Sequence, residues 1–293
     1  MKKMLTMKRI LTITALFFGG TLLAQPKVVE KAIIKVKTET TLPDNMNISS
    51  SGPGGGPGGG GFGGGFSMPR EIESNTTMTY TPDFMKVETM SDFGNNIVIT
   101  DRINKKTTTM IEAMGRKTGF YSTDADAEIQ KARMDSMRNL RRDSLASLGI
   151  IFRDNNPEMI YSEETKKVSG VVCKKVTIKS KGQNGTVNEN IVWYDPSFKL
   201  SPRSTAASAG GMGGGRGMMS MATSMPGLDL IEGFPMEYEI TRPNGFKTHM
   251  IVVKVQLEPS IDAKTFEIPK GFDLKPSSSL GEGGMRMQFR MGN

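Results

Sequence analysis

The sequence has one cysteine, one histidine and one tryptophan among its 293 residues. A lone cysteine, Cys173, cannot form an internal disulfide, so the folded chain must be stabilised by a packed core. Cys173 lies in the run GVVCKKVTIKS, whose β-branched residues favour a strand. We expect a buried thiol there; the alternatives are an intermolecular disulfide or a reactive thiol.

The shortage of histidine argues against catalysis. A single histidine, His249, excludes most metal sites and any catalytic pair that needs a second imidazole. His249 is in phase with Ile251 and Val253, so we expect a strand residue whose ring has a hydrogen-bond partner. The nucleophile motif G-x-S-x-G and the Walker phosphate loop are also absent. We therefore expect no enzyme, no catalytic residue and no cofactor.

The first residues are typical of a secretory signal peptide. MKKMLTMKR carries four positive charges, and the next fifteen residues, ILTITALFFGGTLLA, carry none. A spanning helix needs roughly 20 apolar residues, so an uncleaved membrane anchor is the weaker alternative. Ala24 is a small residue at the expected cleavage point, and no cysteine near it could take a lipid. We expect a signal peptide over 1–24 and an exported protein of the periplasm, the outer envelope or the medium.

The chain has little excess charge once this leader is set aside. The formal net charge is +8, and four of the 38 basic residues lie in the leader. The remaining excess lies in two segments, 203–226 with Arg203 and Arg216, and 275–293 with three basic residues and one acidic residue, so the rest of the chain has no net charge. Because binding to phosphates requires a basic face on the folded domain, we expect no nucleic-acid partner.

Three segments are too rich in glycine to build a core, namely residues 52–66, 209–217 and 281–293. They bury too little apolar surface to offset the entropy lost on ordering, so we expect flexibility. The predicted organisation is a single domain over 25–274, with flexible insertions at 49–68 and 203–226 and a disordered Gly/Met/Arg tail over 275–293.

Elsewhere the chain is mostly strand-like, because eight runs alternate apolar and polar residues between turn-forming residues. In order they are AIIKVKTET, FMKVETM, NNIVIT, KKTTTMIEA, GVVCKKVTIKS, NENIVWYDPS, FPMEYEITRPNG and FKTHMIVVKVQLEPS. Between the fourth and fifth runs, residues 122–149 predict one long helix with a narrow apolar stripe that includes Ile129, Met137 and Leu140. The alternative for this stripe is contact with an anionic membrane or a partner. We expect an α+β fold, a curled antiparallel sheet with the helix packed on it.

Two parts of the sequence resemble an exported bacterial family of unknown function. The C-terminal half has GVVCKK, a WYD strand end, a GFP strand start and a last strand followed by F-x-x-P-x-G-F at residues 266–272. TYTPDFMKVETMSDFGNNIVITDRINKKTTTMI resembles the N-terminal half. The ending is also similar to the LolA/LolB-like lipoprotein carriers, which implies an incomplete antiparallel barrel with an apolar interior for acyl chains. No ligand-contacting residue of the carriers can be matched here, and the glycine-rich insertions depart from them.

These observations predict a non-catalytic envelope protein that binds an apolar ligand, such as a lipid or an acyl chain, in the trough of the curled sheet. A lipid or a lipoprotein would then be its partner. The first alternative is an interaction or scaffold protein that acts through the Gly/Met-rich arms. The second is Cu(I) binding, because thioethers are soft ligands. Its weak candidates, irregularly spaced and without histidine, are Met218, Met219, Met221 and Met225.

Overall fold

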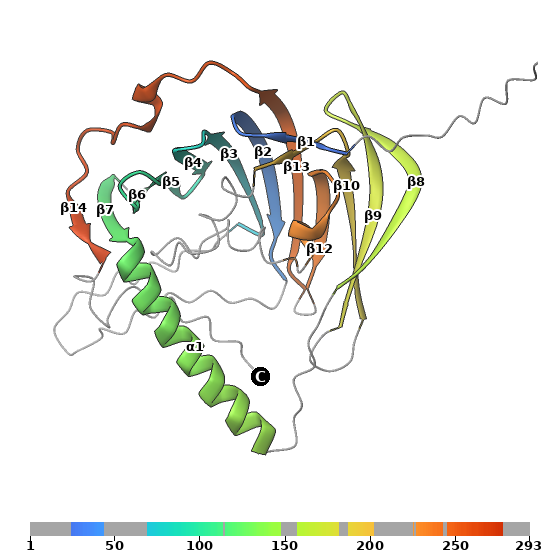
Figure 1. Cartoon of the computed structure of the whole chain (residues 1–293), viewed down its shortest axis with the longest axis horizontal. Helices are drawn as coiled ribbons and strands as arrows, with labels where there is room; N and C mark the ends of the chain where they lie inside the picture. The colour runs from blue at the N-terminus through green and yellow to red at the C-terminus, as the bar shows by residue number, and fades with distance from the viewer. Residues whose placement is uncertain are drawn as a thin grey trace, which may run out of the picture.

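The computed structural model describes several stretches of the chain, shown as ribbon in Figure 1. They are residues 25–43, 69–113, 115–147, 157–181, 187–201, 225, 227–242 and 245–277. The predicted signal peptide and the 49–68 insertion lie outside the described residues, as do most of the 203–226 insertion and most of the tail.

Strands make up most of the described chain. The first half contains β1 (Lys27–Val29), β2 (Ala32–Thr41), β3 (Glu71–Tyr80), β4 (Phe84–Ser91), β5 (Gly94–Asp101), β6 (Lys106–Ala113), β7 (Arg116–Thr123) and the helix α1 (Asp124–Ser147). The second half contains β8 (Glu158–Val168), β9 (Val171–Lys181), β10 (Val187–Asp195), β11 (Phe198–Leu200), η1 (Leu228–Leu230), β12 (Phe234–Thr241), β13 (Lys247–Leu257), η2 (Ala263–Phe266) and β14 (Leu274–Pro276).

One large sheet contains twelve of these strands, in the order β14-β7-β6-β5-β4-β3-β2-β13-β12-β10-β9-β8. Neighbours are antiparallel except at one edge, where β14 runs parallel to β7. The sheet curls strongly (Figure 1), as accumulated strand twist requires. It is not a closed barrel, because β14 and β8 remain its two edges. The prediction of a large, curled antiparallel sheet is confirmed.

Alternation divides the side chains of this sheet between two faces. In β2, Ile34 is buried and its neighbour Lys35 is exposed. The register places Ile34 opposite Met78 of β3 and Met78 opposite Val87 of β4, so these three side chains share a face. We call this the inner face and the opposite one the outer face, because residues 258–273 run outside the curl in Figure 1 and pack on the opposite face.

A large apolar cluster, here called the inner core, extends across the sheet from β4 to β8. β1 and β11 pair with each other and add Val29 and Phe198 to it, and the chain near η1 adds Met225 and Ile231. All four are at most 4% exposed. The chain's own side chains therefore fill this part of the curl. Among the described residues, this part of the curl has no open trough of the kind expected for an apolar ligand, because β1, β11 and the chain near η1 cover it.

The sheet has four strands that alternation did not predict, namely β3, β7, β8 and β14. In β3 the inner-face positions include Ser74 and Thr76, which are buried although polar. The buried Thr76 hydroxyl has a hydrogen-bond partner, the Thr89 hydroxyl on β4, at 3.0 Å. In β8 a run of charged residues suits an edge strand that must not pair further. A search for apolar alternation misses strands of both kinds.

The helix α1 begins at a well-formed cap. The Thr123 hydroxyl accepts a 3.2 Å hydrogen bond from the Asp126 N–H, and the Asp126 carboxylate accepts 2.8 Å hydrogen bonds from the Thr123 N–H and hydroxyl. The hydrogen bond from the Thr123 N–H, with a smaller contribution from the Thr123 hydroxyl, holds the pKa of Asp126 below its ordinary value.

The expected packing of this helix on the sheet is wrong. α1 leaves the end of β7 and crosses the open side of the curl (Figure 1). Ile129, Met137 and Leu140 of the predicted stripe are 67%, 59% and 67% exposed. Their spacing indicates an amphipathic helix, but no face of the sheet covers them. Among the described helices, none is long and apolar enough to cross a membrane.

Candidate functional site

Residues 258–273, here called the closing segment, connect β13 in the middle of the sheet to β14 at its edge (Figure 1). The segment contains η2, which begins where the Asp262 carboxylate accepts a 2.9 Å hydrogen bond from the Lys264 N–H. Gly271 then takes a left-handed φ of +91°, which favours glycine and allows the last turn. The F-x-x-P-x-G-F motif therefore carries the chain across the outer face of the sheet.

The end of the closing segment is seated on β7. Leu274 of β14 lies opposite Gly119 of β7. A Cβ atom on residue 119 would clash with the Leu274 Cδ2 atom, so the absence of a side chain makes room for this leucine. β14 includes Lys275 and Pro276, two residues that the sequence prediction assigned to the tail.

A small apolar cluster, here called the outer core, lies beneath the closing segment on the outer face of β5 and β6. Its buried members are Ile97, Ile99 and Met110, and the partly buried Phe266, Phe272 and Leu274 pack on them. Phe266 also stacks on Phe84 of β4, with ring centroids 5.2 Å apart and an interplanar angle of 24°. Among the described residues, three buried side chains belong to this cluster, so much of its apolar surface is shared with the closing segment.

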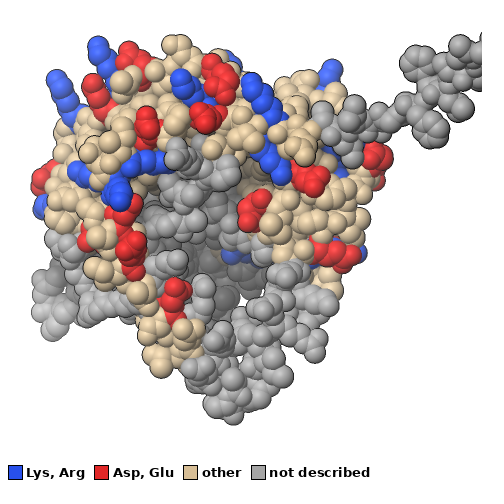
Figure 2. Space-filling model, in the orientation of Figure 1, with Lys and Arg blue, Asp and Glu red and all other residues tan. Residues whose placement is uncertain are grey.

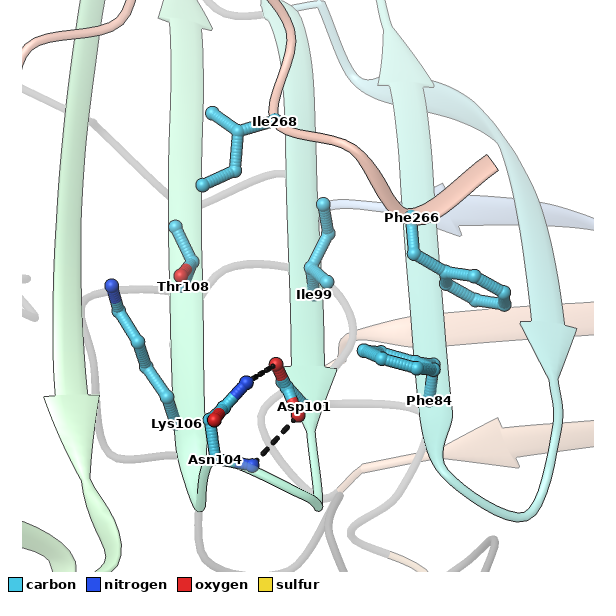
Figure 3. Close-up of a pocket in the computed structure, with 8 residues that line it drawn as sticks. All are labelled: Phe84, Ile99, Asp101, Asn104, Lys106, Thr108, Phe266 and Ile268. Atoms are coloured by element: carbon cyan, nitrogen blue, oxygen red, sulfur yellow. Dashed lines mark hydrogen bonds between the residues drawn. The ribbon is translucent and has the colours of Figure 1, made fainter. Parts of the chain in front are cut away.

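A cavity of about 260 Å³ lies beside the outer core, between the closing segment and the ends of β4, β5 and β6 (Figure 3). Apolar walls come from Phe84, Ile99, Phe266 and Ile268, and a polar end comes from Asp101, Asn104, Lys106 and Thr108. One end of the cavity therefore favours hydrocarbon, and the other favours a polar or charged group.

The polar end is held rigid by the β5–β6 turn. The Asp101 carboxylate accepts hydrogen bonds from the Asn104 N–H at 2.9 Å and from the Asn104 side-chain amide at 2.7 Å (Figure 3). Lys105 takes a left-handed φ of +49°, and its carbonyl accepts a 3.0 Å hydrogen bond from the Asp124 N–H. Both carboxylate oxygens of Asp101 are thus engaged within the turn.

The apolar wall at Phe84 is fixed by the β3–β4 turn. The Thr81 hydroxyl oxygen accepts a 2.9 Å hydrogen bond from the Phe84 N–H and donates to the Phe84 carbonyl at 3.1 Å. From the neighbouring turn, Arg102 Nη1 donates to the carbonyls of Thr81 at 3.0 Å and Pro82 at 3.2 Å. The two turns brace each other, so the rim of the cavity is preorganised.

Lys106 is the one cation among the residues that line this cavity. Its Nζ lies 4.2 Å from the centroid of the Tyr121 ring, within the range of a cation–π contact. The register places Lys106 directly opposite Asp101, yet the described residues contain no ion pair to its ammonium. The carboxylate of Asp101 instead accepts hydrogen bonds from the turn residue Asn104.

A second hollow, of about 440 Å³, lies at the ends of β10 and β12. It is lined by Val187, Asn188, Glu189, Asn190, Ile191, Glu239 and Thr241. Glu189 is already paired with Lys179 at 2.7 Å. Amides and carboxylates dominate this hollow, so it is a poor site for an apolar ligand.

His249 has the hydrogen-bond partner that its place in a strand predicts. Its Nε2 atom lies 3.1 Å from Glu237 Oε1, and Lys166 Nζ lies 2.7 Å from Glu237 Oε2. Burial alone would raise the pKa of Glu237, but hydrogen bonds from Lys166 and His249 outweigh it and lower that pKa. This cluster lies on the outer face, far along the sheet from the closing segment, and is explained as a structural one.

Cys173 lies in β9 and is fully buried, as the sequence predicts. Burial, with a smaller contribution from Asp195, raises the pKa of its thiol to about 11. The thiol is therefore protonated at neutral pH, which does not suit a nucleophile.

Of the four methionines predicted as weak Cu(I) candidates, the described residues include one. Met225 is 4% exposed and belongs to the inner core, whereas Met218, Met219 and Met221 lie outside the described residues, as does Ala24. Within the described stretches, no group of three or more His, Cys, Asp or Glu side chains could hold a metal ion.

The similarity of this chain to known proteins lies in solved structures of low sequence identity. No family model matches the chain, and no curated protein matches its sequence. Two crystal forms of PNGF-II match with a TM-score of 0.32 and 12% or 13% identity, covering 86% or 88% of this chain and 33% of that one. The chain thus spans about a third of the length of PNGF-II.

A domain from Vibrio parahaemolyticus, provisionally described as an outer membrane lipoprotein-sorting protein, matches with a TM-score of 0.27 and 8% identity. The match covers 80% of this chain and 88% of that one. The LolA-like resemblance of the sequence therefore stays a prediction.

The sequence prediction named none of the residues that line the cavity. Phe84 and Phe266 are far apart in the chain, and only the crossing of the outer face by the closing segment brings them together. The signal that could have found them is the F-x-x-P-x-G-F motif itself. Two phenylalanines that follow a long strand need an apolar surface on which to pack. A face of the sheet not already covered by other elements is the available surface.

Proposed function

We propose that this protein is a non-catalytic, exported binding protein whose ligand is apolar and inserts a hydrocarbon chain under the closing segment. The observation that carries the proposal is the cavity beside the outer core, with Phe84, Ile99, Phe266 and Ile268 as its walls. The predicted ligand class is kept, while the site moves from the inner face of the sheet to the outer one.

The size of the cavity limits what it can hold. About 260 Å³ is just below the range of roughly 300–1,000 Å³ for pockets that bury a drug-sized ligand. A short acyl chain or the end of a longer one suits that volume. Each buried methylene contributes about 0.8 kcal/mol, before the cost of immobilising the ligand. Binding of this kind is reversible and requires no covalent step.

The chemistry of the rim supports binding rather than catalysis. Asp101 is the single carboxylate among the residues that line the cavity, and it accepts two hydrogen bonds from Asn104. It is therefore poorly placed to act as a general base for the Thr108 hydroxyl. The leader-like residues 1–24 support export, so the proposed ligand is a lipid or a lipoprotein acyl chain of the cell envelope.

Extraction of the purified protein with organic solvent, followed by mass spectrometry, tests the proposal directly. We expect an acyl lipid to be recovered in a fixed ratio to protein. Binding of a fluorescent acyl probe provides a second readout. No lipid in the extract and no saturable binding of the probe would contradict the proposal.

A matched pair of variants assigns the binding to this cavity. Ile268 lines the cavity and is 44% exposed, whereas Ile160 on β8 is 41% exposed and lines neither hollow. We expect Ile268→Ser to weaken binding of the acyl probe about fivefold to tenfold, because it replaces an apolar wall by a hydroxyl. Ile160→Ser should leave binding unchanged. Equal effects of both substitutions would place the probe elsewhere.

A further inference from the structure

We infer that the ligand is an anionic amphiphile, whose negatively charged group binds the Lys106 ammonium while its hydrocarbon enters the apolar part of the cavity. This inference rests on the proposed function and adds the charge of the ligand and its direction in the site. The observation behind it is that the β5–β6 turn engages the Asp101 carboxylate in hydrogen bonds and leaves the Lys106 ammonium without an ion pair among the described residues.

The first step is the missing ion pair between Asp101 and Lys106. These residues are directly opposite each other in the β5–β6 ladder, where opposite charges usually attract. Asn104 instead occupies both Asp101 oxygens, through its backbone N–H and its side-chain amide. The turn thereby holds the carboxylate away from the lysine that it would otherwise neutralise.

The second step compares Lys106 with two other lysines on the outer face; Figure 2 shows basic residues lying beside acidic ones over much of the visible surface. Lys37 pairs with Glu39 and Glu73 at 3.1 and 2.9 Å, and Lys86 pairs with Glu88 at 3.4 Å. Lys106 has the Tyr121 ring at 4.2 Å, and the described residues bring no carboxylate within ion-pair distance of it. An aromatic ring orients an ammonium without neutralising it, so the charge stays available to a ligand.

The third step is the direction that this arrangement imposes on a ligand. Figure 3 shows Lys106 at one side of the cavity and the stacked Phe84 and Phe266 at the other, with Ile99 and Thr108 between them. A hydrocarbon chain can lie along the apolar walls only if its polar group is at the lysine end. A cationic headgroup is disfavoured there, because Lys106 would repel it and Asp101 is already occupied.

A single ammonium binds a carboxylate or a phosphate as a point charge, without the fork geometry that would select between them. A free fatty acid and a phosphorylated lipid therefore share the chemistry that the site recognises. The experiment can separate them by using probes with the same chain and different headgroups.

The test measures binding of decanoate, decyl phosphate and 1-decanol to the full-length protein by titration calorimetry. We expect the two anions to bind about tenfold more tightly than the alcohol, the size of effect typical of a hydrogen bond to a charged group. A preference between the two anions identifies the headgroup source. The difference from the alcohol should shrink with added salt, because the rim is open to solvent.

Three variants test the role of Lys106. Lys106→Gln should remove the preference for anions and leave the binding of 1-decanol unchanged, whereas Lys106→Arg should retain the preference. Lys199→Gln is the matched control, because Lys199 is half-buried on β11 and lines neither hollow. It should behave like the wild-type protein.

The outcomes separate the two proposals. If all three probes bind equally and Lys106→Gln changes nothing, the inference about charge is wrong and the apolar site stands. If none of the probes binds, the proposed function itself is wrong. Loss of anion preference in Lys199→Gln as well would show general electrostatic attraction and would also overturn the role of Lys106.

Discussion

Two stacked phenylalanine pairs occupy opposite faces of the same sheet and have nearly the same geometry. Phe198 and Phe234 are 4.9 Å apart at 19° in the inner core, and Phe84 and Phe266 are 5.2 Å apart at 24° on the outer face. Their surroundings differ. Phe198 is 2% exposed within a cluster of twenty buried residues, whereas the outer core has three.

The difference separates stability from binding. The inner core is filled by elements from distant parts of the sequence, which leaves no room for a ligand there. The outer core is covered by one segment without regular ladder pairing until β14, and it leaves a cavity at its side. A surface that is incompletely covered is where a ligand can complete the packing.

The largest expected effect is the loss of stability on removing the Phe198 ring from the inner core. Phe198→Ala should lower the free energy of unfolding by about 3–5 kcal/mol, because it leaves a cavity in a tightly packed core. Chemical denaturation followed by circular dichroism measures this loss. The protein that remains folded should bind the acyl probe with unchanged affinity. If Phe198→Ala lowered the free energy of unfolding less than Phe266→Ala does, the inner core would not be the more stabilising of the two.

Removing the outer ring should affect stability less and binding more. Phe266→Ala deletes a partly exposed ring, so we expect a loss of about 1–2 kcal/mol in the free energy of unfolding. It also removes a wall of the cavity, and probe binding should fall by about tenfold or more. Unchanged binding in a folded Phe266→Ala protein would exclude the cavity as the site.

The smallest expected effect is a pH dependence at the other end of the outer face. The pKa of Glu237 is lower in the folded protein than its ordinary value of 4.5, since Lys166 and His249 stabilise the carboxylate. The carboxylate therefore stabilises the fold above about pH 4.5, and this contribution is lost as the pH falls through the lowered pKa. We expect it to be about 1 kcal/mol or less.

Unfolding of Glu237→Gln at about pH 6 and about pH 3 measures this contribution. The variant should lose less stability on acidification than the wild-type protein does. Glu189→Gln is the control, because Glu189 also pairs with a lysine but its side chain is 53% exposed. An identical acid response in Glu237→Gln and the wild-type protein would contradict the role of this pair.

Much of the sheet could be predicted from alternation, and its failures have a physical cause. Alternation found β2 and β13, where one face is apolar and the other polar. It failed in β3, where Ser74 and Thr76 are buried, because a hydroxyl that finds a partner can occupy an inner position. The helix was predicted from its stripe, but amphipathicity does not say which surface, if any, covers it.

The candidate site was harder to predict than the fold. The F-x-x-P-x-G-F motif showed that the chain closes over something, but not which face of the sheet lies beneath. That depends on the strand order, which carries the chain past β2 to β6 on the way from β13 to β14. The role of Lys106 depends on the hydrogen bonds that engage Asp101, which no pattern of residue types reveals.

The route of the closing segment also sets when the cavity can exist. Its floor, on β4 to β6, leaves the ribosome early, but Phe266 and Ile268 emerge only after almost every strand has been made. Because chains are synthesised from the N-terminus, a partly made protein would have the floor without the roof. Ligand capture would therefore report that the last part of the chain has docked.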